Sequence, residues 1–165
     1  MQTNKWSVAA LDGLLLALIT ITATLIQTIF EPGSAISWLL WLVKLVSTVG
    51  LLYFFVKDYS KNQELFTYKD GFQFGFMISF LSSIICGSYM FLHYTLIFPD
   101  SLAKVMENVA TAMQSSGGDT SAFEKIQKYL PHFISVFSLI YYSIFGLIAS
   151  AIIANSTKKG DVFSE

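Results

Sequence analysis

Lys44 interrupts the apolar run SWLLWLVKLVSTVGLLYFF, which extends from residue 37 to residue 55. Asp12 is a second charged residue inside an apolar stretch. A charged side chain at the centre of a membrane-spanning helix costs about 2.5–3.5 kcal/mol on insertion scales, and such residues are functional candidates by default. Both residues lie off-centre, which lowers this cost. Each side chain could extend its charged end to the membrane surface, which is called snorkelling, or form a structural ion pair. Alternatively, the two residues could line a polar pathway or contact lipid headgroups.

The partner of Lys44 depends on depth. Lys44 lies roughly 10–12 Å below one end of its expected helix, at about 1.5 Å per residue. Glu31 ends the neighbouring helix at that same surface, within the combined reach of the two side chains. Asp12 lies about one turn in from the opposite end, so contact with Lys44 would need considerable helix tilt. We therefore expect Lys44 to snorkel or to pair with Glu31, rather than with Asp12.

Other reactive side chains form no recognisable constellation. His93, His132 and Asp100 are expected near one surface, but their spacing is not that of a metal site. Cys86 is the only cysteine, which excludes an internal disulfide. The chain has no paired-carboxylate site, nucleophile elbow, phosphate loop or dinucleotide fingerprint. We expect no catalytic residue, no metal, no cofactor and no enzymatic activity.

The composition is that of a membrane protein. Hydrophobic residues make up 54% of the 165 residues and charged residues 13%, about half the charged share of a typical soluble domain. The net charge of −1 gives no indication of a nucleic-acid partner. All ten basic residues are Lys, so the chain lacks the bidentate fork of Arg for phosphate or carboxylate recognition.

Four segments are long and apolar enough to cross a bilayer, which requires roughly 20 residues. They are residues Val8–Phe30, Ile36–Val56, Gly71–Phe98 and His132–Ala154. The first is too long for the apolar region of a signal peptide, and we expect it to be a retained helix. The predicted fold is all-α: one membrane domain, an integral bundle of four transmembrane helices with a helical extracytoplasmic loop.

The connections and the lysines predict the threading. Glu31–Ala35 is expected to be a tight turn and Lys57–Asp70 a short polar loop. Cytoplasmic loops carry an excess of Lys and Arg. With the N-terminus inside, six lysines lie on the cytoplasmic side and three on the other, namely Lys5, Lys57, Lys61, Lys69, Lys158 and Lys159 against Lys104, Lys125 and Lys128. We expect a multi-pass protein with both termini in the cytoplasm.

The segment 99–131 is expected to be helical rather than a linker. One apolar face recurs at helical spacing in its first part, through Leu102, Val105, Met106, Val109, Ala110 and Met113. Asp100 or Ser101 is the expected cap. Ser121 and Glu124 form a capping box for a second short helix with Phe123, Ile126 and Leu130. These apolar faces could cover the lipid interface or the end of the bundle, or could dock a partner.

Small residues recur at every fourth position in three of the four segments. In the third segment they are Gly71, Gly75, Ser79, Ser83 and Gly87. In the fourth they are Gly146, Ser150 and Ala154, and in the first Ala9, Gly13 and Ala17. Helices in lipid associate through the close approach that such residues permit. We expect the third helix to be central and the ladder to pack inside the bundle, although it could serve a homodimer instead.

The stretch FTYKDGFQFGF opens the third segment with an aromatic residue, then Gly-Phe, then Gly: Tyr68, Gly71, Phe72 and Gly75. With Gly13 and the long loop before the fourth segment, it resembles the bacterial membrane family catalogued as domain of unknown function 4199. The resemblance spans nearly the whole chain. It implies a four-helix protein of the bacterial inner membrane and brings no catalytic residues. It also implies an accessory role, since members are often encoded near membrane glycosyltransferases.

Two classes of function follow from these features. The first is a non-enzymatic accessory or scaffold subunit, embedded in the lipid bilayer, for a glycosyltransferase-like membrane partner or for a homo-oligomer. The second is a small oligomeric transporter or channel with Lys44 and Asp12 near its pathway. Transporters often contain helices broken by Gly or Pro, and none of the four segments has an internal proline. We therefore favour the accessory subunit, and a stoichiometric partner would distinguish it from a transporter.

Overall fold

A computed structural model describes residues 4–115 and 129–159 of the chain. The described residues form α-helices joined by short connections, and the all-α prediction is confirmed. The helices are α1 (Lys5–Phe30), α2 (Ser34–Lys61), α3 (Tyr68–Leu92), which continues into the π-helical turn η1 (His93–Ile97), α4 (Pro99–Ser115) and α6 (Leu130–Thr157). Four of them, with η1 counted into α3, are long and apolar enough to cross a membrane, as predicted.

α2 is longer than expected and shortens the polar connection that follows it. The sequence predicts a loop from Lys57 to Asp70, but Lys57–Lys61 forms the last turn of α2. Three local contacts support this turn: the Ser60 hydroxyl donates to the Lys57 carbonyl at 2.7 Å, Lys61 pairs with Asp58 at 3.1 Å, and the Tyr59 ring stacks on Phe74 at 3.9 Å. Charged residues thus continue an apolar helix, which its hydropathy does not predict.

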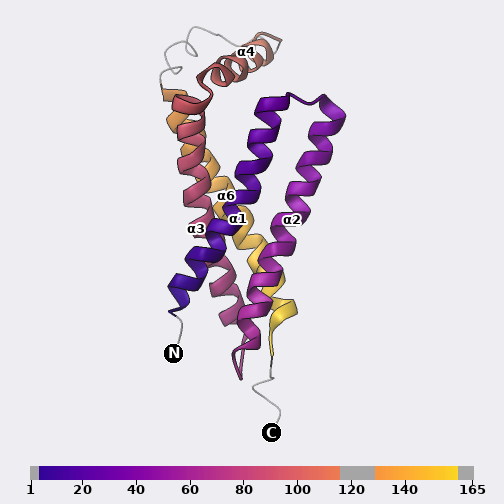
Figure 1. Ribbon diagram of the computed structural model, residues 1–165, viewed down its shortest axis with the longest axis vertical. Coiled ribbons are helices and arrows are strands. Elements are labelled where there is room, and N and C mark those ends of the chain that lie inside the picture. The colour runs from indigo at the N-terminus through magenta and orange to yellow at the C-terminus, as the bar shows by residue number, and fades with distance from the viewer. Residues whose placement is uncertain (1–3, 116–128, 160–165) are drawn as a thin grey trace.

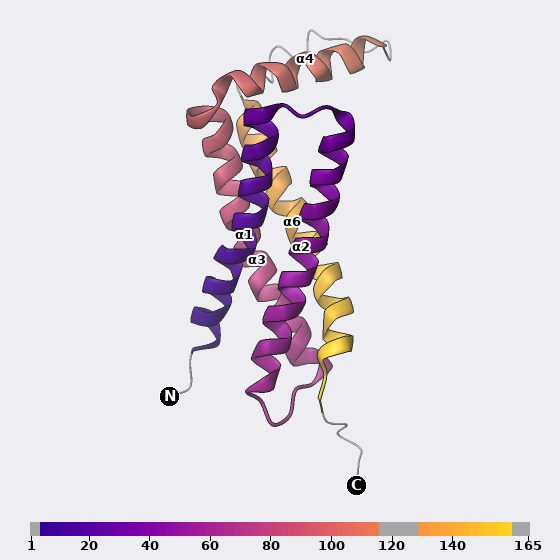
Figure 2. The same ribbon diagram turned by 45° about the vertical axis from the view of Figure 1, so that its right-hand side comes forward.

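α3 is the central helix, as expected from its ladder. It packs most extensively against α6 and next against α1, while α2 makes fewer contacts with each of its neighbours. Figures 1 and 2 show α1, α3 and α6 side by side, with α2 beside them and α4 lying across one end of the bundle. The end with α4 and the α1–α2 turn is called the hairpin end. The opposite end, where α1 begins and α6 stops, is called the termini end.

Burial is concentrated toward the termini end. The buried residues of α1 run from Ala9 to Thr20, and its last ten residues contain none. α2 runs in the opposite direction and is buried only in its last part, since its first buried residue is Leu52. Figures 1 and 2 show α2 beside α3 and α6 at the termini end and apart from them toward the hairpin end. The bundle is therefore closed in one half and open in the other.

The turn between α1 and α2 is tight. Glu31 ends α1 in the left-handed conformation, with φ 43°, and its amide donates to the Gln27 carbonyl at 3.2 Å. A non-glycine residue rarely adopts this conformation. Gly33 precedes α2 without a side-chain cap.

α4 occupies the position predicted for the first loop helix, but it starts earlier than its expected caps. Pro99 is its first residue, so Asp100 lies inside the first turn. The Ser101 hydroxyl donates to the Phe98 carbonyl at 2.6 Å instead of accepting from a free amide. Proline is favoured at a first helical position because its missing N–H leaves no unpaired donor. The second predicted loop helix lies outside the described residues except for Leu130, which begins α6.

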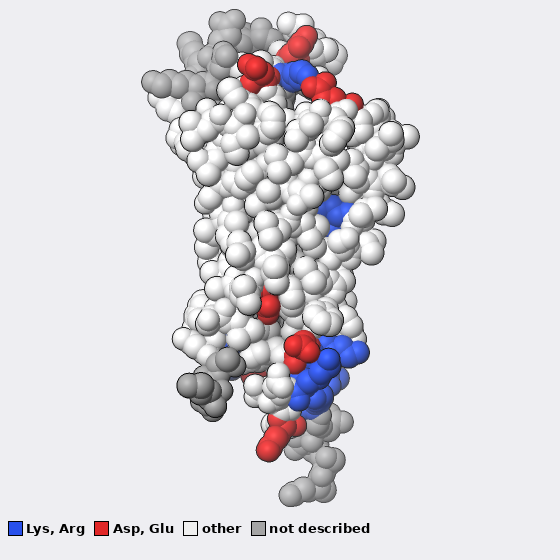
Figure 3. Space-filling model, in the orientation of Figure 1, with Lys and Arg blue, Asp and Glu red and all other residues white. Residues whose placement is uncertain are grey.

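Charged side chains gather at the two ends of the molecule. Figure 3 shows a broad uncharged band between these ends, broken on this face by isolated basic and acidic patches. Such a band is what a bilayer core requires of the surface that it contacts. The termini end is rich in lysine, with Lys57, Lys61, Lys69, Lys158 and Lys159 in or beside the helix ends there.

Candidate functional site

The seam between α3 and α6 is built on small residues that face each other in reverse order. A Cβ atom added at Gly71 would lie 3.2 Å from the Cα of Ala154, and one added at Gly75 would lie 2.9 Å from the Ser150 hydroxyl. A Cβ added at Gly146 would lie 2.2 Å from the Cβ of Ser79. A real Cβ contact is never as short as the one at Gly146, so that position tolerates only glycine at the observed helix spacing, whereas a side chain at Gly71 or Gly75 would require the neighbouring atoms to shift.

The same seam continues toward the hairpin end with hydrogen bonds. The hydroxyls of Ser83 and Ser143 lie 2.8 Å apart, and the Ser135 hydroxyl donates to the Gly87 carbonyl at 2.7 Å. A Cβ added at Gly87 would lie 3.2 Å from the Cβ of Leu139. All five small residues of the α3 ladder are buried. The surface that a homodimer would have needed is occupied by α6 of the same chain.

The small residues of α1 are buried, and Gly13 among them lies against α3. Ala9 and Ala17 are fully buried. A Cβ at Gly13 would lie 2.9 Å from the Ile78 carbonyl oxygen and 3.2 Å from the Cβ of Leu81. The structure therefore brings the three predicted sets of small residues into one assembly around α3.

Lys44 faces the interior of the open half. Its Nζ lies 5.9 Å from the centre of the Tyr142 ring on α6, near the outer limit for a cation–π contact. A cavity of about 40 Å³ beside it is lined by Thr20, Thr48 and Tyr142, among others, and contains no carboxylate. Lys44 is half-buried. Within the described residues it has no ion-pair partner, because the ion pairs there are Lys61–Asp58 and Lys104–Glu31.

Neither expected partner reaches Lys44. Glu31 forms an ion pair with Lys104 of α4 instead, and this pair joins the end of α1 to α4. Asp12 is 9% exposed and belongs to the closed half, where it lies on the buried face of α1. Among the described residues that line the cavities beside Lys44, none is acidic. Lys44 thus has no ion-pair partner among the described residues, and its ammonium lies over the Tyr142 ring instead.

A lateral groove separates the hairpin-end halves of α1 and α2. It has a volume of about 470 Å³, and Lys44 lies at its wall. The remaining lining residues come from the facing sides of the two helices: Leu18, Ile19, Thr22, Ala23, Ile26, Leu40, Val43 and Ser47. The outer side of α2 beside the groove carries Trp38, Leu39 and Val46, which are 61–70% exposed. This region offers the bilayer an unfilled apolar surface with one ammonium group beside it.

A small internal cavity extends from the Lys44 region toward the core. Its volume is about 20 Å³, and its lining includes Thr20, Ser79, Ser82 and Cys86. The Ser79 hydroxyl, like that of Ser150, is buried without a hydrogen-bond partner among the described residues. A cavity of about 10–15 Å³ or more suffices for one water when polar groups line it. The volume and lining are those of a site for a single water that would satisfy Ser79.

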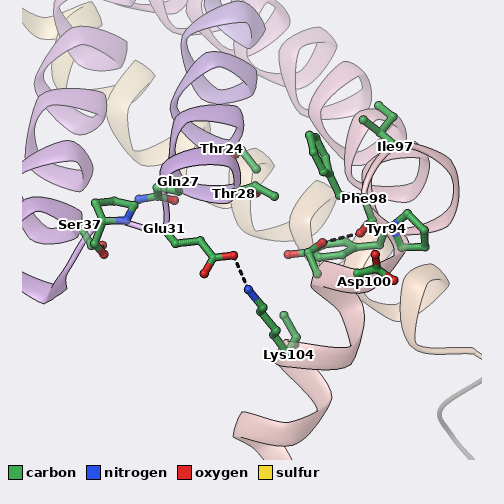
Figure 4. Close-up of a pocket in the computed structure, with 14 residues that line it drawn as sticks. Thr24, Gln27, Thr28, Glu31, Ser37, Tyr94, Ile97, Phe98, Asp100 and Lys104 are labelled. Carbon is green, nitrogen blue, oxygen red and sulfur yellow. Dashed lines mark hydrogen bonds and ion pairs between the residues drawn. The ribbon is translucent and has the colours of Figure 1, made fainter.

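A larger cleft lies at the hairpin end, between α1, α2, η1 and α4. Its volume is about 650 Å³. Figure 4 shows Glu31 reaching across it from the end of α1 to Lys104 on α4, with Tyr94 and Phe98 on the opposite wall. Hydroxyl and amide groups supply most of the remaining polar lining, through Thr24, Gln27, Thr28, Ser37 and Ser101.

His93 is the first residue of η1, the π-helical turn that lines part of the hairpin-end cleft. It is fully buried, and both ring nitrogens are engaged, Nε2 with the Thr28 hydroxyl at 3.1 Å and Nδ1 with the Tyr89 hydroxyl at 3.0 Å. His132 is exposed and packs its ring edge against Phe91. The two histidines therefore do not converge. Within the described residues no three His, Cys, Asp or Glu side chains come together in a possible metal site.

At the termini end, the residue that follows α6 bonds to the end of α2 and to the α2–α3 connection, and the sequence did not predict these contacts. Phe66, in the α2–α3 connection, exchanges two backbone hydrogen bonds with Lys159, at 3.2 and 2.8 Å. The Lys159 ammonium also donates to the Ser60 carbonyl at 3.1 Å. α3 begins with a capping box between Thr67 and Asp70, which the residue types at that spacing could have predicted. The pairing of Phe66 with Lys159 has no comparable local signal.

Comparison with protein families gives a match that covers most of the chain. The family model described as "Protein of unknown function (DUF4199)" matches residues 11–159, which confirms the resemblance seen in the sequence. No curated protein and no solved structure matches the chain. The match thus adds no activity, substrate or partner to the geometry described above.

Proposed function

The chain belongs to the DUF4199 family, and on that premise we propose that it is a non-enzymatic accessory subunit that docks a transmembrane helix of a membrane partner. The docking place is the lateral groove between the hairpin-end halves of α1 and α2. One observation supports this most directly: Lys44 lies half-buried at the groove wall and lacks a carboxylate within the described residues.

The chemistry of Lys44 specifies the partner helix. An ammonium group in an apolar surrounding is stabilised by an opposite charge that is itself removed from water. The partner helix should therefore carry an Asp or Glu at the depth of Lys44 and apolar residues elsewhere on that face. Small residues on the same face would allow the helix to approach Ala23 and Ser47 closely.

A second copy of this chain fits the groove less well. The only acidic residue in the middle of a span is Asp12, seven residues after the start of α1. At about 1.5 Å per residue it lies roughly 10 Å from the termini end, whereas Lys44 lies roughly 25 Å from that end. A parallel copy would therefore present its carboxylate at the wrong depth. This difference supports a partner of another sequence over a homo-oligomer formed through this groove.

Transport finds less support in the same geometry. Lys44 lines two cavities, and Asp12 is not among the lining residues of either. The two cavities toward the core measure about 20 and 40 Å³, room for single waters rather than for a solute. A pathway through both charged residues would need the closed half to separate.

Crosslinking inside the native membrane tests the docking proposal. A photoreactive residue at Val43, in the groove, should form an adduct of one defined mass, whereas the same residue at Ile148, exposed on α6, should not. The adduct should contain a membrane protein with an acidic residue in a spanning helix, and Lys44→Met should remove it. Adducts with lipid alone, or with another copy of this chain, would refute the docking proposal.

The proposal includes an orientation, with the termini end in the cytoplasm of a bacterial inner membrane. Its support is the excess of lysine at the termini end. Reporter domains fused after Ser115 and after Glu165 should give signals from opposite sides of the membrane. Signals from the same side would contradict the threading.

The proposal also assigns the small-residue ladder its role. We propose that the four-residue spacing of Gly, Ser and Ala holds α3 against α6 and α1, since apolar burial contributes little to helix association in lipid. The short approach distances at Gly75 and Gly146 support this assignment.

A further inference from the structure

We propose that the hairpin-end cleft binds the zwitterionic headgroup of a phospholipid of the ethanolamine class, with the phosphate at Lys104 and the ammonium at Glu31. The proposal is independent of the partner-helix groove, because the two cavities share no lining residue. It starts from the pair of opposite charges that faces the cleft.

The position of the cleft selects a lipid rather than a solute from either bulk phase. It lies where α1 ends, α2 begins and η1 passes into α4, at one end of the candidate membrane spans. Headgroups occupy this level of a bilayer, just outside the hydrocarbon core. The apolar residues Ile97, Phe98 and Val105 share the lining with the polar groups, as the boundary between a headgroup and its chains requires.

Three charged side chains line the cleft, the ammonium of Lys104 and the carboxylates of Glu31 and Asp100, so both charges of a zwitterion can find an opposite charge there. Lys104 supplies a point charge for a phosphate, and the chain has no arginine that could do so instead. Glu31 supplies a carboxylate for an ammonium group. Gln27, Ser37 and Ser101 add neutral donors and acceptors for phosphate and ester oxygens. Tyr94 adds an aromatic wall, a favourable neighbour for a cation.

The ion pair that closes the cleft is easy to exchange. The side chains of Lys104 and Glu31 are 61% and 63% exposed. Exposed pairs contribute little to stability, because water and salt already screen them. A ligand with one charge of each sign can therefore replace the pair with two new contacts while leaving neither Lys104 nor Glu31 without a partner.

The backbone around the cleft has two uncommon conformations. Glu31 has a positive φ of 43°, and residues His93–Ile97 form a π-helical turn. Such features concentrate at functional sites, where the surrounding structure holds them in place. Both supply lining residues here, namely Glu31 itself and Tyr94 and Ile97 of η1.

Native mass spectrometry of the detergent-purified chain provides the test. Titration with phosphatidylethanolamine should give a saturable one-to-one adduct, and phosphatidylglycerol, which lacks the ammonium, should bind about tenfold more weakly. Glu31→Gln and Lys104→Gln should each weaken the phosphatidylethanolamine adduct by about tenfold. Loss of the Glu31 carboxylate should also reduce the preference for phosphatidylethanolamine over phosphatidylglycerol, with Asp100 left as the one carboxylate among the described lining residues.

The matched controls are Asp58→Asn and Lys61→Gln at the termini end. This pair has side-chain exposures of 57% and 58%, close to those of the cleft pair, and lies far along the bundle from it. Both controls should bind as the parent chain does. Thermal unfolding of each variant shows whether it is folded, and the charge-reversed double variant Glu31→Lys with Lys104→Glu provides a folded alternative that retains an ion pair.

Three outcomes would overturn the proposal. The first is equal binding of phosphatidylethanolamine and phosphatidylglycerol by the parent chain. The second is an unchanged adduct in both Glu31→Gln and Lys104→Gln. The third is that soluble phosphoethanolamine binds as tightly as the lipid, which would make the ligand a water-soluble metabolite. The docking test at Val43 is unaffected by any of these results, so the two proposals fail separately.

Discussion

The two halves of this bundle differ in how their helices meet. In the termini half, a Cβ at Gly75 or Gly146 would collide with α6 or α3, and Leu52 and Val56 of α2 are buried against the same cluster as Phe74. In the hairpin half, α2 from Ser34 to Leu51 contains no buried residue. One half is closed by backbone-to-backbone approach, and the other remains open around a lysine.

The difference shows what holds helices together in lipid. Both halves are rich in large apolar side chains, yet these alone do not close the hairpin half, since lipid solvates them as well as a neighbouring helix does. The glycine and serine ladder keeps α3 against α6 in both halves, whereas α2 has no such ladder and is buried only near the termini end. In the hairpin half the inner face of α2 carries Lys44 and Thr48 instead.

The largest effect is expected for Gly146→Ala. The new Cβ would lie 2.2 Å from the Cβ of Ser79, so α3 and α6 must move apart. Overpacking of this kind costs about 1–3 kcal/mol. Denaturant unfolding in mild detergent, followed by circular dichroism, measures the change. The matched control is Gly50→Ala in α2, where a Cβ meets no atom within 4 Å and alanine favours the helix.

A second variant separates sterics from helix propensity at this seam. Ser79→Gly combined with Gly146→Ala moves the Cβ from one helix to the other and should recover part of the loss. If Gly146→Ala and Gly50→Ala had equal small effects, the close approach of α3 and α6 would not be what closes the termini half.

An intermediate effect is expected for Thr67→Ala at the start of α3. The change removes both bonds of the Thr67 hydroxyl, which accepts from the Asp70 amide at 3.3 Å and donates to the Asp70 carboxylate at 2.6 Å, while the Thr67 amide can still donate to that carboxylate. Loss of such a cap costs about 1 kcal/mol. The corresponding change at the hairpin end is Gly33→Ser, where α2 has no side-chain cap and a Cβ meets nothing within 4 Å.

Gly33→Ser should be neutral or stabilise the chain by a few tenths of a kcal/mol. Both variants are compared by thermal unfolding in the same detergent. A loss on Thr67→Ala no larger than the scatter between repeat measurements would show that the termini end does not depend on this cap.

The smallest effect is expected for Lys44→Met. The change removes a cation–π contact with Tyr142, worth about 0.5–1 kcal/mol for such pairs, and also removes the cost of holding a charge in apolar surroundings. These two effects oppose each other, so the free energy of unfolding of the isolated chain should change by about 0.5 kcal/mol or less.

A double-mutant cycle with Asp12→Asn sharpens this result. Asp12 lies in the other half, and distant sites without shared partners are additive to about 0.5 kcal/mol. Strong rescue of Lys44→Met by Asp12→Asn would instead place both charges in one polar core. The cycle is measured on the isolated chain, so that partner binding does not contribute.

Several features could be predicted from the sequence because they depend on neighbouring residues in the chain. The membrane spans follow from the length of the apolar segments, and the all-α class follows from helical periodicity. The apolar face of α4 follows from the spacing of Leu102 and Val105. The ladder from Gly71 to Gly87 is visible in the same way, since four residues return to one face of a helix. A one-dimensional pattern contains the information for each of these.

Only the tertiary structure decided which surfaces those patterns meet. The α3 ladder faces α6 and α1 of its own chain, Glu31 binds Lys104, Lys44 turns toward Tyr142, and Phe66 pairs with Lys159. Each contact joins residues that are distant in sequence, and it depends on the rotation and tilt that the helices adopt together. In a bilayer many rotations expose equally apolar faces, so close packing at a few small residues selects one, and local sequence does not encode that choice.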